Sequence, residues 1–175
     1  MRLSAVALTC VLACAVVVSG QAGIDARTTN HLKQLFPQAG GFLPKGGDLP
    51  TFRAVNDPKA ASPTVLGYAF YTTEMQPLER AYDGPIKWLV GMNTGGIITG
   101  VVLVEHKEPY GDFSIETAAF QNQFKSKDIR DAFKVGADID AISRATVSVT
   151  SSARAIRNSA RRVARTLLTP PGESR

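Results

Sequence analysis

IKWLVGMNTGGIITGVVLVE, residues 86–105, is the stretch that decides the fold. It holds two apolar runs rich in β-branched residues, Ile86 to Met92 and Ile97 to Glu105, a composition typical of strands. Between them, Asn93-Thr94-Gly95-Gly96 supplies residues that tolerate the positive φ of a tight turn. The stretch therefore predicts a β-hairpin.

The pattern continues on both sides of this hairpin. Two earlier strands are predicted over 51–55 and 65–72, and three helices over 28–36, 115–124 and 151–168, where Pro170-Pro171 ends the last one. Glycines and Pro44 predict a loop through 40–47, and Gly67 and Gly100 indicate bulges or the close approach of a ligand. The predicted class is α+β: a small antiparallel sheet with a central hairpin, packed by helices and including a long C-terminal helix.

Composition excludes several classes of protein. The 175 residues include 20 Lys+Arg and 15 Asp+Glu, so the formal charge is 20 − 15 = +5, and 44% are hydrophobic. This favours one folded domain over a disordered chain. Two Cys and two His are too few for a disulfide scaffold, a zinc finger or a resident iron–sulfur cluster. The motifs G-x-S-x-G, G-x-G-x-x-G and H-E-x-x-H do not occur.

The N-terminus has the layout of a secretory signal. Arg2 precedes an apolar run over 3–18, and small and polar residues follow over 19–22, so we expect cleavage after Ala22 and a periplasmic protein. An uncleaved anchor is the first alternative, but sixteen residues reach only about 24 Å of a ~30 Å hydrocarbon core. Lipidation at Cys14 is the second alternative, although the apolar run continues past it. The expected organisation is a signal peptide (1–22), a loop-rich extension (23–49), a folded domain (50–168) and a tail (169–175).

Two further clusters carry charge. Glu105-His106-Lys107-Glu108 ends the second hairpin strand, where His106 and Glu108 would share one face; a polar strand end and part of a ligand pocket are both open readings. The last predicted helix carries an apolar stripe opposite five arginines, Arg154, Arg157, Arg161, Arg162 and Arg165. That arginine face fits solvent, an anionic membrane surface or an acidic partner better than nucleic acid.

The stretch that points to chemistry is Asp140-Ala141-Ile142-Ser143-Arg144-Ala145-Thr146-Val147-Ser148. Ser148, Thr150 and Ser151 are N-cap candidates for the next helix, whose N–H groups and positive dipole end would point toward Thr146. Asp140 and Ser143 can hold the loop by local side-chain to backbone bonds. An ordinary Ser/Thr-rich turn before a helix is the plainer reading of the same residues.

This stretch resembles the flavin-attachment motif of the FMN-binding domain family, in which a final Thr is esterified to the FMN phosphate; by position that is Thr146. The resemblance extends over about 50–168, through Gly67-Tyr68-Ala69-Phe70, the hairpin, Glu105-His106-Lys107-Glu108-Pro109 and Ser159 to Arg165. It is nearest to the exported N-terminal domain of NosR-type proteins, which support nitrous oxide reductase. Flavin subunits of the Rnf and sodium-pumping quinone reductase complexes are more distant.

The resemblance implies an FMN-binding electron-transfer domain, more an electron carrier than a stand-alone enzyme. Its implied partners are a periplasmic flavin transferase, with FAD as FMN donor, and membrane redox proteins. The implied cofactor-binding residues are Asp140, Ser143, Arg144, Ala145, Thr146, Val147, Ser148, His106, Glu108, Pro109 and Tyr110. Candidate walls for the ring are Tyr68, Phe70, Trp88 and Tyr110; we expect most of the four to be core residues and one or two to reach the ring.

Arg144 departs from the family motif, which usually has Gly there. If the position needs positive φ, an Arg is strained by about 1 kcal/mol or more. Arg144 could pair with the flavin phosphate, or it could block the transferase. The second possibility leaves an alternative function open, a flavin-free regulatory or interaction module of the same fold.

Overall fold

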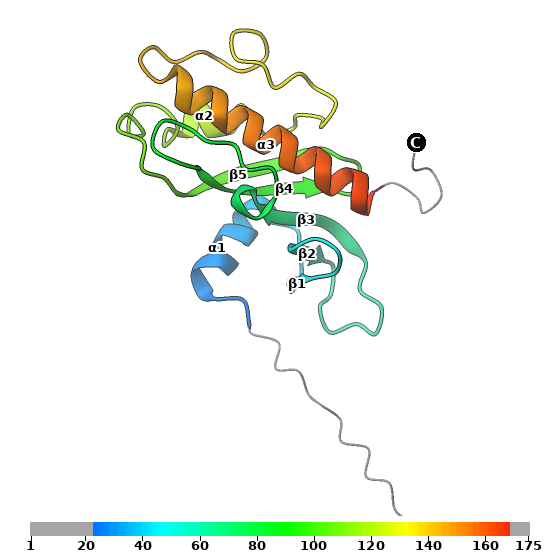
Figure 1. Ribbon diagram of the computed structural model, residues 1–175. Helices are drawn as coiled ribbons and strands as arrows, with labels where there is room; N and C mark the ends of the chain where they lie inside the picture. Colours follow the sequence, from blue (N-terminus) through cyan, green and yellow to red (C-terminus); the bar gives the residue numbers. More distant parts are fainter. Residues whose placement is uncertain (1–22, 169–175) are drawn as a thin grey trace, which may run out of the picture.

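One antiparallel sheet organises the chain, which a computed structural model describes over residues 23–168 (Figure 1). Each strand pairs with the next along the chain, in the order β1-β2-β3-β4-β5. The strands are β1 (Gly41–Gly46), β2 (Thr51–Val55), β3 (Val65–Tyr71), β4 (Lys87–Asn93) and β5 (Ile98–Glu105). The predicted hairpin is therefore the β4–β5 pair, and the α+β class is confirmed. The predicted signal peptide and tail lie outside the described residues.

Helices cover both faces of this sheet (Figure 1). The short helix α1 (Ala26–Leu35) packs on β4 and β5 from one side, and α3 (Thr146–Leu167) crosses β4 on the other. The remaining helical elements are α2 (Ala118–Asn122) and the short 3₁₀ helix η1 (Thr72–Glu74). Within residues 23–168, no helix combines the length and the apolar character that a bilayer crossing needs.

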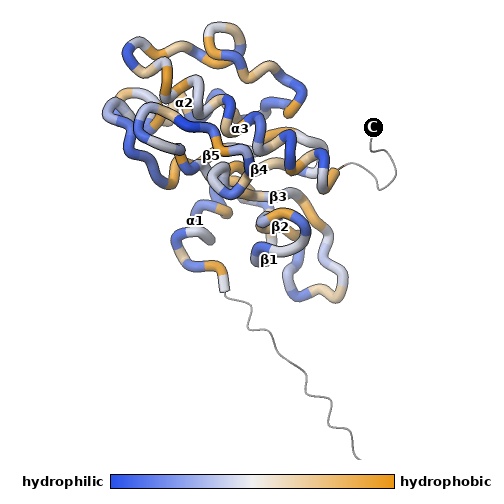
Figure 2. The backbone as a smooth tube through the Cα atoms, in the orientation of Figure 1, coloured by the Kyte–Doolittle hydropathy of each residue, from blue (hydrophilic) through white to orange (hydrophobic). Residues whose placement is uncertain are grey.

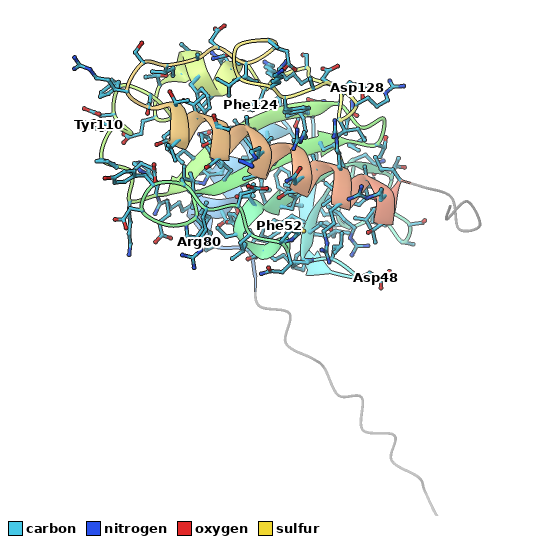
Figure 3. All side chains as sticks on the ribbon, turned by 45° about the horizontal axis from the view of Figure 1, so that its top comes forward. Asp48, Phe52, Arg80, Tyr110, Phe124 and Asp128 are labelled. Atoms are coloured by element: carbon cyan, nitrogen blue, oxygen red, sulfur yellow. The ribbon has the colours of Figure 1, made fainter. Side chains whose placement is uncertain are left out.

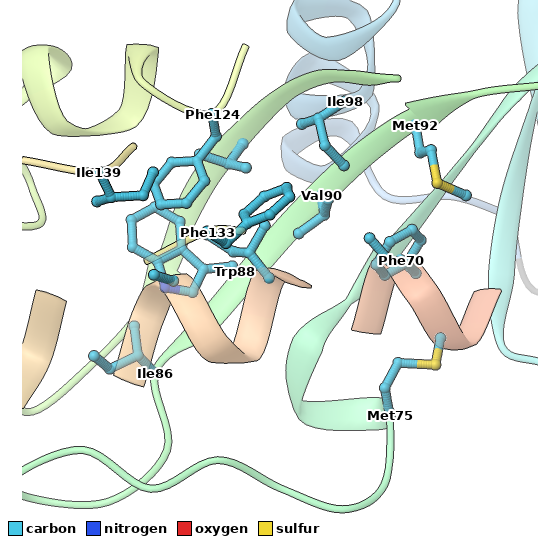
Figure 4. Packing of buried hydrophobic residues seen from close by; sticks show 14 of the residues in the cluster. Phe70, Met75, Ile86, Trp88, Val90, Met92, Ile98, Phe124, Phe133 and Ile139 are labelled. Carbon is cyan, nitrogen blue, oxygen red and sulfur yellow. The ribbon is translucent and has the colours of Figure 1, made fainter. Parts of the chain in front are cut away.

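Strand β4 is apolar on both faces because a helix covers each of them. Trp88, Val90 and Met92 point to the core under α3, whereas Leu89 joins the cluster under α1. Trp88 lies in the middle of the larger core (Figure 4), and its indole N–H donates to Ser152 Oγ of α3 at 3.2 Å. This bond satisfies a donor that would otherwise be buried without a partner.

Helix α3 forms because its apolar residues recur at helical spacing. Ala153, Ile156, Ala160 and Val163 are all buried against the sheet, as the sequence predicts. Figure 2 shows the resulting alternation of hydrophobic and hydrophilic segments along α3. The burial of this stripe fixes the helix axis across the sheet, and with it the position of the helix N-terminus.

Three predicted boundaries are wrong. Helix α3 begins at Thr146 rather than Ser151, because buried residues such as Val149 extend its packed stripe through a segment of low helix propensity. Helix α2 covers only Ala118–Asn122 of the predicted 115–124. Strand β1 replaces the loop predicted through 40–47; Pro44 is tolerated because β1 is an edge strand with an irregular register.

The missing side chain of Gly67 leaves room for Phe36, which follows α1, and not for a ligand. A Cβ placed there would lie 2.5 Å from the Met92 carbonyl oxygen and 2.6 Å from the Phe36 ring, which follows α1. We expect Gly67→Ala to lower the free energy of unfolding by about 1–3 kcal/mol, because neither neighbour can retreat easily. Urea unfolding would measure the change. Gly46→Ala, where a Cβ meets nothing within 4 Å, is the matched control; an equal loss there would contradict this reading.

Candidate functional site

The N-terminus of α3 is open in the sense that no side chain caps its first N–H groups. The side chain of its N-cap residue, Ala145, is a methyl group, which cannot accept a hydrogen bond from the first turn. The first hydrogen bond of the helix runs from Val149 N–H to the Ala145 carbonyl. Among the described residues, the N–H groups of Thr146, Val147 and Ser148 therefore have no acceptor. The predicted N-caps Ser148, Thr150 and Ser151 are wrong, because all three lie inside the helix. An open helix start of this kind favours an anion.

Of the hydroxyl groups around this helix start, Thr146 is the accessible one on the helix itself. Thr146 is exposed at the first helical position, whereas Ser148, two residues on, is buried. The Ser148 hydroxyl is moreover committed, because it donates to the Glu108 carboxylate. Ser143 is also exposed, but it lies in the turn before the helix. On the first turn of α3, Thr146 therefore has the exposed hydroxyl and Ser148 the buried, hydrogen-bonded one.

Glu108 ties three segments together at the helix start. Its carboxylate is buried and accepts from Ser148 Oγ, from Asp83 N–H at 3.0 Å and from Tyr82 N–H at 3.4 Å. The turn around 81–84, the loop after β5 and the first turn of α3 therefore meet at one side chain. These three hydrogen bonds compensate for the loss of hydration that burial imposes on the carboxylate.

His106 lies next to this junction. Its Nδ1 accepts from Glu108 N–H at 3.0 Å, and its Nε2 lies 3.1 Å from Glu116 Oε1. Because Nδ1 accepts, the neutral ring carries its proton on Nε2 and donates it to Glu116. The prediction that His106 and Glu108 share one strand face is wrong: β5 ends at Glu105, and both residues lie in the loop beyond it.

Exposed aromatic and apolar side chains gather on the segments that meet at Glu108. Among the described residues, five large hydrophobic side chains are exposed, and four belong to these segments: Tyr82 (74%), Val147 (53%), Tyr110 (49%) and Phe113 (45%). Tyr110 and Phe113 pack ring to ring, with centroids 5.6 Å apart. Figure 3 places Tyr110 near the start of α3. The Tyr110–Phe113 pair, with Tyr82 and Val147 on neighbouring segments, is therefore the candidate binding surface of this region.

Most of the candidate ring walls belong to the core, as we expected. Phe70 and Trp88 are fully buried under α3, and Tyr68 is packed against the same core, so of the four candidates only Tyr110 is exposed. Tyr82 and Phe113, which are exposed in loops, were not among the predicted wall residues. Their position in loops that flank the His-x-Glu segment was the signal that could have found them.

The loop before α3 is held by Asp138 rather than by the predicted Asp140 and Ser143. The Asp138 carboxylate accepts from Lys134 N–H at 2.6 Å, Phe133 N–H at 2.9 Å and Lys127 Nζ at 3.1 Å. Burial raises the pKa of this carboxyl, but these hydrogen bonds outweigh it and hold the pKa below its usual value. Asp140 and Ser143 are exposed, and within the described part of the chain their side chains make no such bond.

Arg144 adopts the left-handed conformation that the sequence reasoning considered, with φ at 68°. Its side chain is exposed, and within residues 23–168 it has no hydrogen-bond or ion-pair partner. An uncommitted guanidinium therefore lies two residues before Thr146, at a helix start that favours anions. A Cβ in this conformation costs about 1–2 kcal/mol.

This strain predicts that Arg144→Gly raises stability. Relief of the Cβ contact outweighs the extra chain entropy of glycine, which leaves a gain of roughly 0.5–1 kcal/mol in the free energy of unfolding. Arg144→Ala is the matched control, since it removes the guanidinium but keeps the Cβ. Chemical denaturation of the three proteins would show Gly above both Arg and Ala; an equal gain in Ala would attribute the effect to charge instead.

The site thus combines an exposed hydroxyl, that of Thr146, with an uncapped helix N-terminus. Arg144 and exposed aromatic side chains lie on the neighbouring segments. Residues 81–161 match the sequence model of the FMN-binding domain, and this match indicates FMN as the cofactor. The match spans the Glu108 junction and Thr146. A comparison with curated proteins found no match.

The residues present fit this cofactor. Free N–H groups at the α3 start and the Arg144 guanidinium are donors suited to a phosphate, and the buried Glu108 carboxylate nearby already accepts from donors of its own. Tyr82, Tyr110 and Phe113 supply exposed aromatic surface suited to an isoalloxazine ring. FMN, when bound, supplies one- and two-electron redox chemistry, and the protein supplies its attachment and surroundings.

Proposed function

We propose that this chain is an exported electron-transfer domain that carries FMN as a phosphoester on Thr146. The observation that supports the linkage is the contrast between two hydroxyls on the same turn: Thr146 is exposed beside three free N–H groups, whereas Ser148 is buried and bonded to Glu108. The family match supports the flavin, and the redox chemistry of FMN supports the role of electron carrier.

Attachment would be a group transfer with FAD as donor. Thr146 Oγ forms a bond to the phosphorus on the FMN side of FAD, the pyrophosphate P–O bond breaks, and AMP leaves. The hydroxyl proton passes to a base of the flavin transferase. The product phosphodiester keeps one negative charge, which the open start of α3 and Arg144 are placed to stabilise.

The wider role that we propose follows from the resemblance to NosR-type proteins. The domain would relay electrons between a membrane redox partner and an extracytoplasmic acceptor, in support of nitrous oxide reductase. Its signal peptide would deliver it to the periplasm, where the transferase acts. Exposed aromatic residues around Thr146 would leave one edge of the flavin reachable by both partners.

The experiment that tests the linkage exports the full chain in cells with an active periplasmic flavin transferase. The protein is then denatured, freed of small molecules and digested, and the peptides are examined for flavin fluorescence and mass. We expect flavin on the peptide that contains Thr146. Flavin that is released on denaturation would show non-covalent binding, and a colourless protein would favour the flavin-free regulatory module.

A further inference from the structure

A second charged feature lies at the opposite end of α3 from Thr146. A groove of about 620 Å³ runs between the tip of the β4–β5 hairpin, the segment 128–130 and the last turns of the helix. Thr146 and Arg165 are nineteen positions apart on one helix, which corresponds to roughly 28 Å. Figure 3 places Asp128, which lines the groove, well away from Tyr110. The groove is thus separate from the proposed flavin site.

Three arginines line this groove, Arg130, Arg161 and Arg165, against one acidic residue, Asp128. Asp128 is already engaged: both its carboxylate oxygens accept from Arg130, at 2.9 and 2.5 Å. The hydrogen bond from Arg130 lowers the pKa of Asp128 to about 2, so this pair persists at neutral pH and is lost only as the pH falls from about 4 toward 2. The lining therefore carries a net excess of two positive charges.

The two remaining arginines differ in how they are held. Arg161 donates from Nε to the Ile129 carbonyl at 2.7 Å and from a terminal nitrogen to the Asp131 carbonyl at 2.8 Å, so its guanidinium is fixed in place without a carboxylate partner. Arg165 is exposed and has no partner among residues 23–168. One fixed and one unengaged guanidinium on the same wall suit the fork geometry of a phosphate or carboxylate.

The groove also has apolar surface. Ile129, Ala164 and Leu168 line it, and the small residues Gly95 and Gly96 form its edge at the hairpin turn. The hairpin tip is held against this segment by a bond from Ile129 N–H to the Gly96 carbonyl at 3.0 Å. Cations beside an apolar wall select an anion that also carries an apolar part, in preference to a bare inorganic ion.

We propose that this groove is an anion-binding site for a phosphate carried on an apolar body, with the phosphate at Arg161 and Arg165 and the apolar part on Ile129, Ala164 and Leu168. Two sources share this chemistry: a soluble organic phosphate and a phospholipid headgroup. The site does not depend on the proposed flavin linkage, because none of its residues belongs to the α3 start or the Glu108 junction.

The probe for the soluble source is phenyl phosphate, measured by calorimetry on the full chain. We expect saturable binding that is tighter than that of inorganic phosphate and absent for phenol, and a loss of at least tenfold in Arg165→Gln. Arg154→Gln is the matched control: Arg154 is exposed on the same helix, outside the groove, and lies 3.9 Å from Glu79. Equal effects of the two substitutions, or no saturable binding, would overturn the proposal.

The probe for the lipid source is flotation with vesicles of phosphatidylcholine that contain phosphatidylglycerol. Binding that Arg165→Gln abolishes and phenyl phosphate displaces would assign the groove to a headgroup. Vesicle binding that falls equally in Arg154→Gln, or that phenyl phosphate leaves unchanged, would be general surface electrostatics and would contradict a headgroup at the groove. Arg130→Gln gives a second test, since it leaves Asp128 unpaired in the groove and should weaken phenyl phosphate binding as well.

Discussion

Thr146→Val abolishes covalent flavin, and Thr146→Ser preserves it, if the phosphoester is formed as proposed. Valine keeps the shape of threonine and its exposed place at the first helical position, so the helix and the core beneath it are undisturbed. Only the nucleophilic oxygen is lost. Serine returns that oxygen without the methyl group. Fluorescence retained on the denatured polypeptide measures the outcome, and we expect a complete loss in the valine variant.

Two control substitutions sharpen this test. Ser143→Ala removes the other exposed hydroxyl of the motif, and Ser148→Ala removes the buried one that bonds Glu108. We expect both proteins to carry covalent flavin. Flavin that survives in Thr146→Val but disappears in Ser143→Ala would move the attachment site to the turn and overturn the assignment to Thr146.

Glu108→Ala carries the second large effect, a loss of about 2–4 kcal/mol in the free energy of unfolding. The substitution leaves the buried Ser148 hydroxyl and the partly buried N–H groups of Tyr82 and Asp83 without their acceptor. An unsatisfied buried group costs about 1–3 kcal/mol, and a partly buried one costs less because water reaches it. Some of this is recovered if water enters. Urea unfolding measures the stability, and flavin loading by the transferase should fall with it, because the helix start loses its tie to the neighbouring loops.

Glu108→Gln separates the role of shape from the role of charge. Its amide oxygen can still accept from Asp83 N–H, and its amide nitrogen can donate to Ser148 Oγ, so we expect a loss of about 1 kcal/mol and near-normal flavin loading. Glu116→Ala removes an exposed acceptor of His106 and should change little. If Gln proves as damaging as Ala, the negative charge of Glu108 matters more than its hydrogen bonds.

Arg144 links the strain in the fold to the chemistry of the site. Its left-handed backbone conformation is strained for arginine and would not be strained for glycine. Its guanidinium, which has no partner among the described residues, belongs to a residue two positions before Thr146. If Arg144 assists attachment, Arg144→Gly yields a more stable protein that takes up less flavin. If it hinders the transferase, the same variant takes up more. The two measurements, stability and loading, are therefore informative as a pair.

The sequence by itself determined the elements whose pattern is local. The β4–β5 hairpin follows from two apolar runs around Asn93-Thr94-Gly95-Gly96, and Asn93 Oδ1 does accept from the N–H groups of Gly95 and Ile97 at the turn. The buried stripe of α3 follows from apolar residues at helical spacing. FMN was also readable, since the resemblance rests only on residue types in order, and residues 81–161 match the FMN-binding domain model.

Only the tertiary structure decided which residues around the motif are available. By sequence, Phe70 and Trp88 could line either the ring or the core, and their burial under α3 assigns both to the core. Tyr82, far from the motif in sequence, is linked to it through Glu108. The start of α3 moved to Thr146 because packing of Val149 outweighed weak local helix propensity. Whether a side chain is exposed to a ligand depends on which other segments pack over it. Those contacts join residues that are distant in sequence, so no local pattern predicts them.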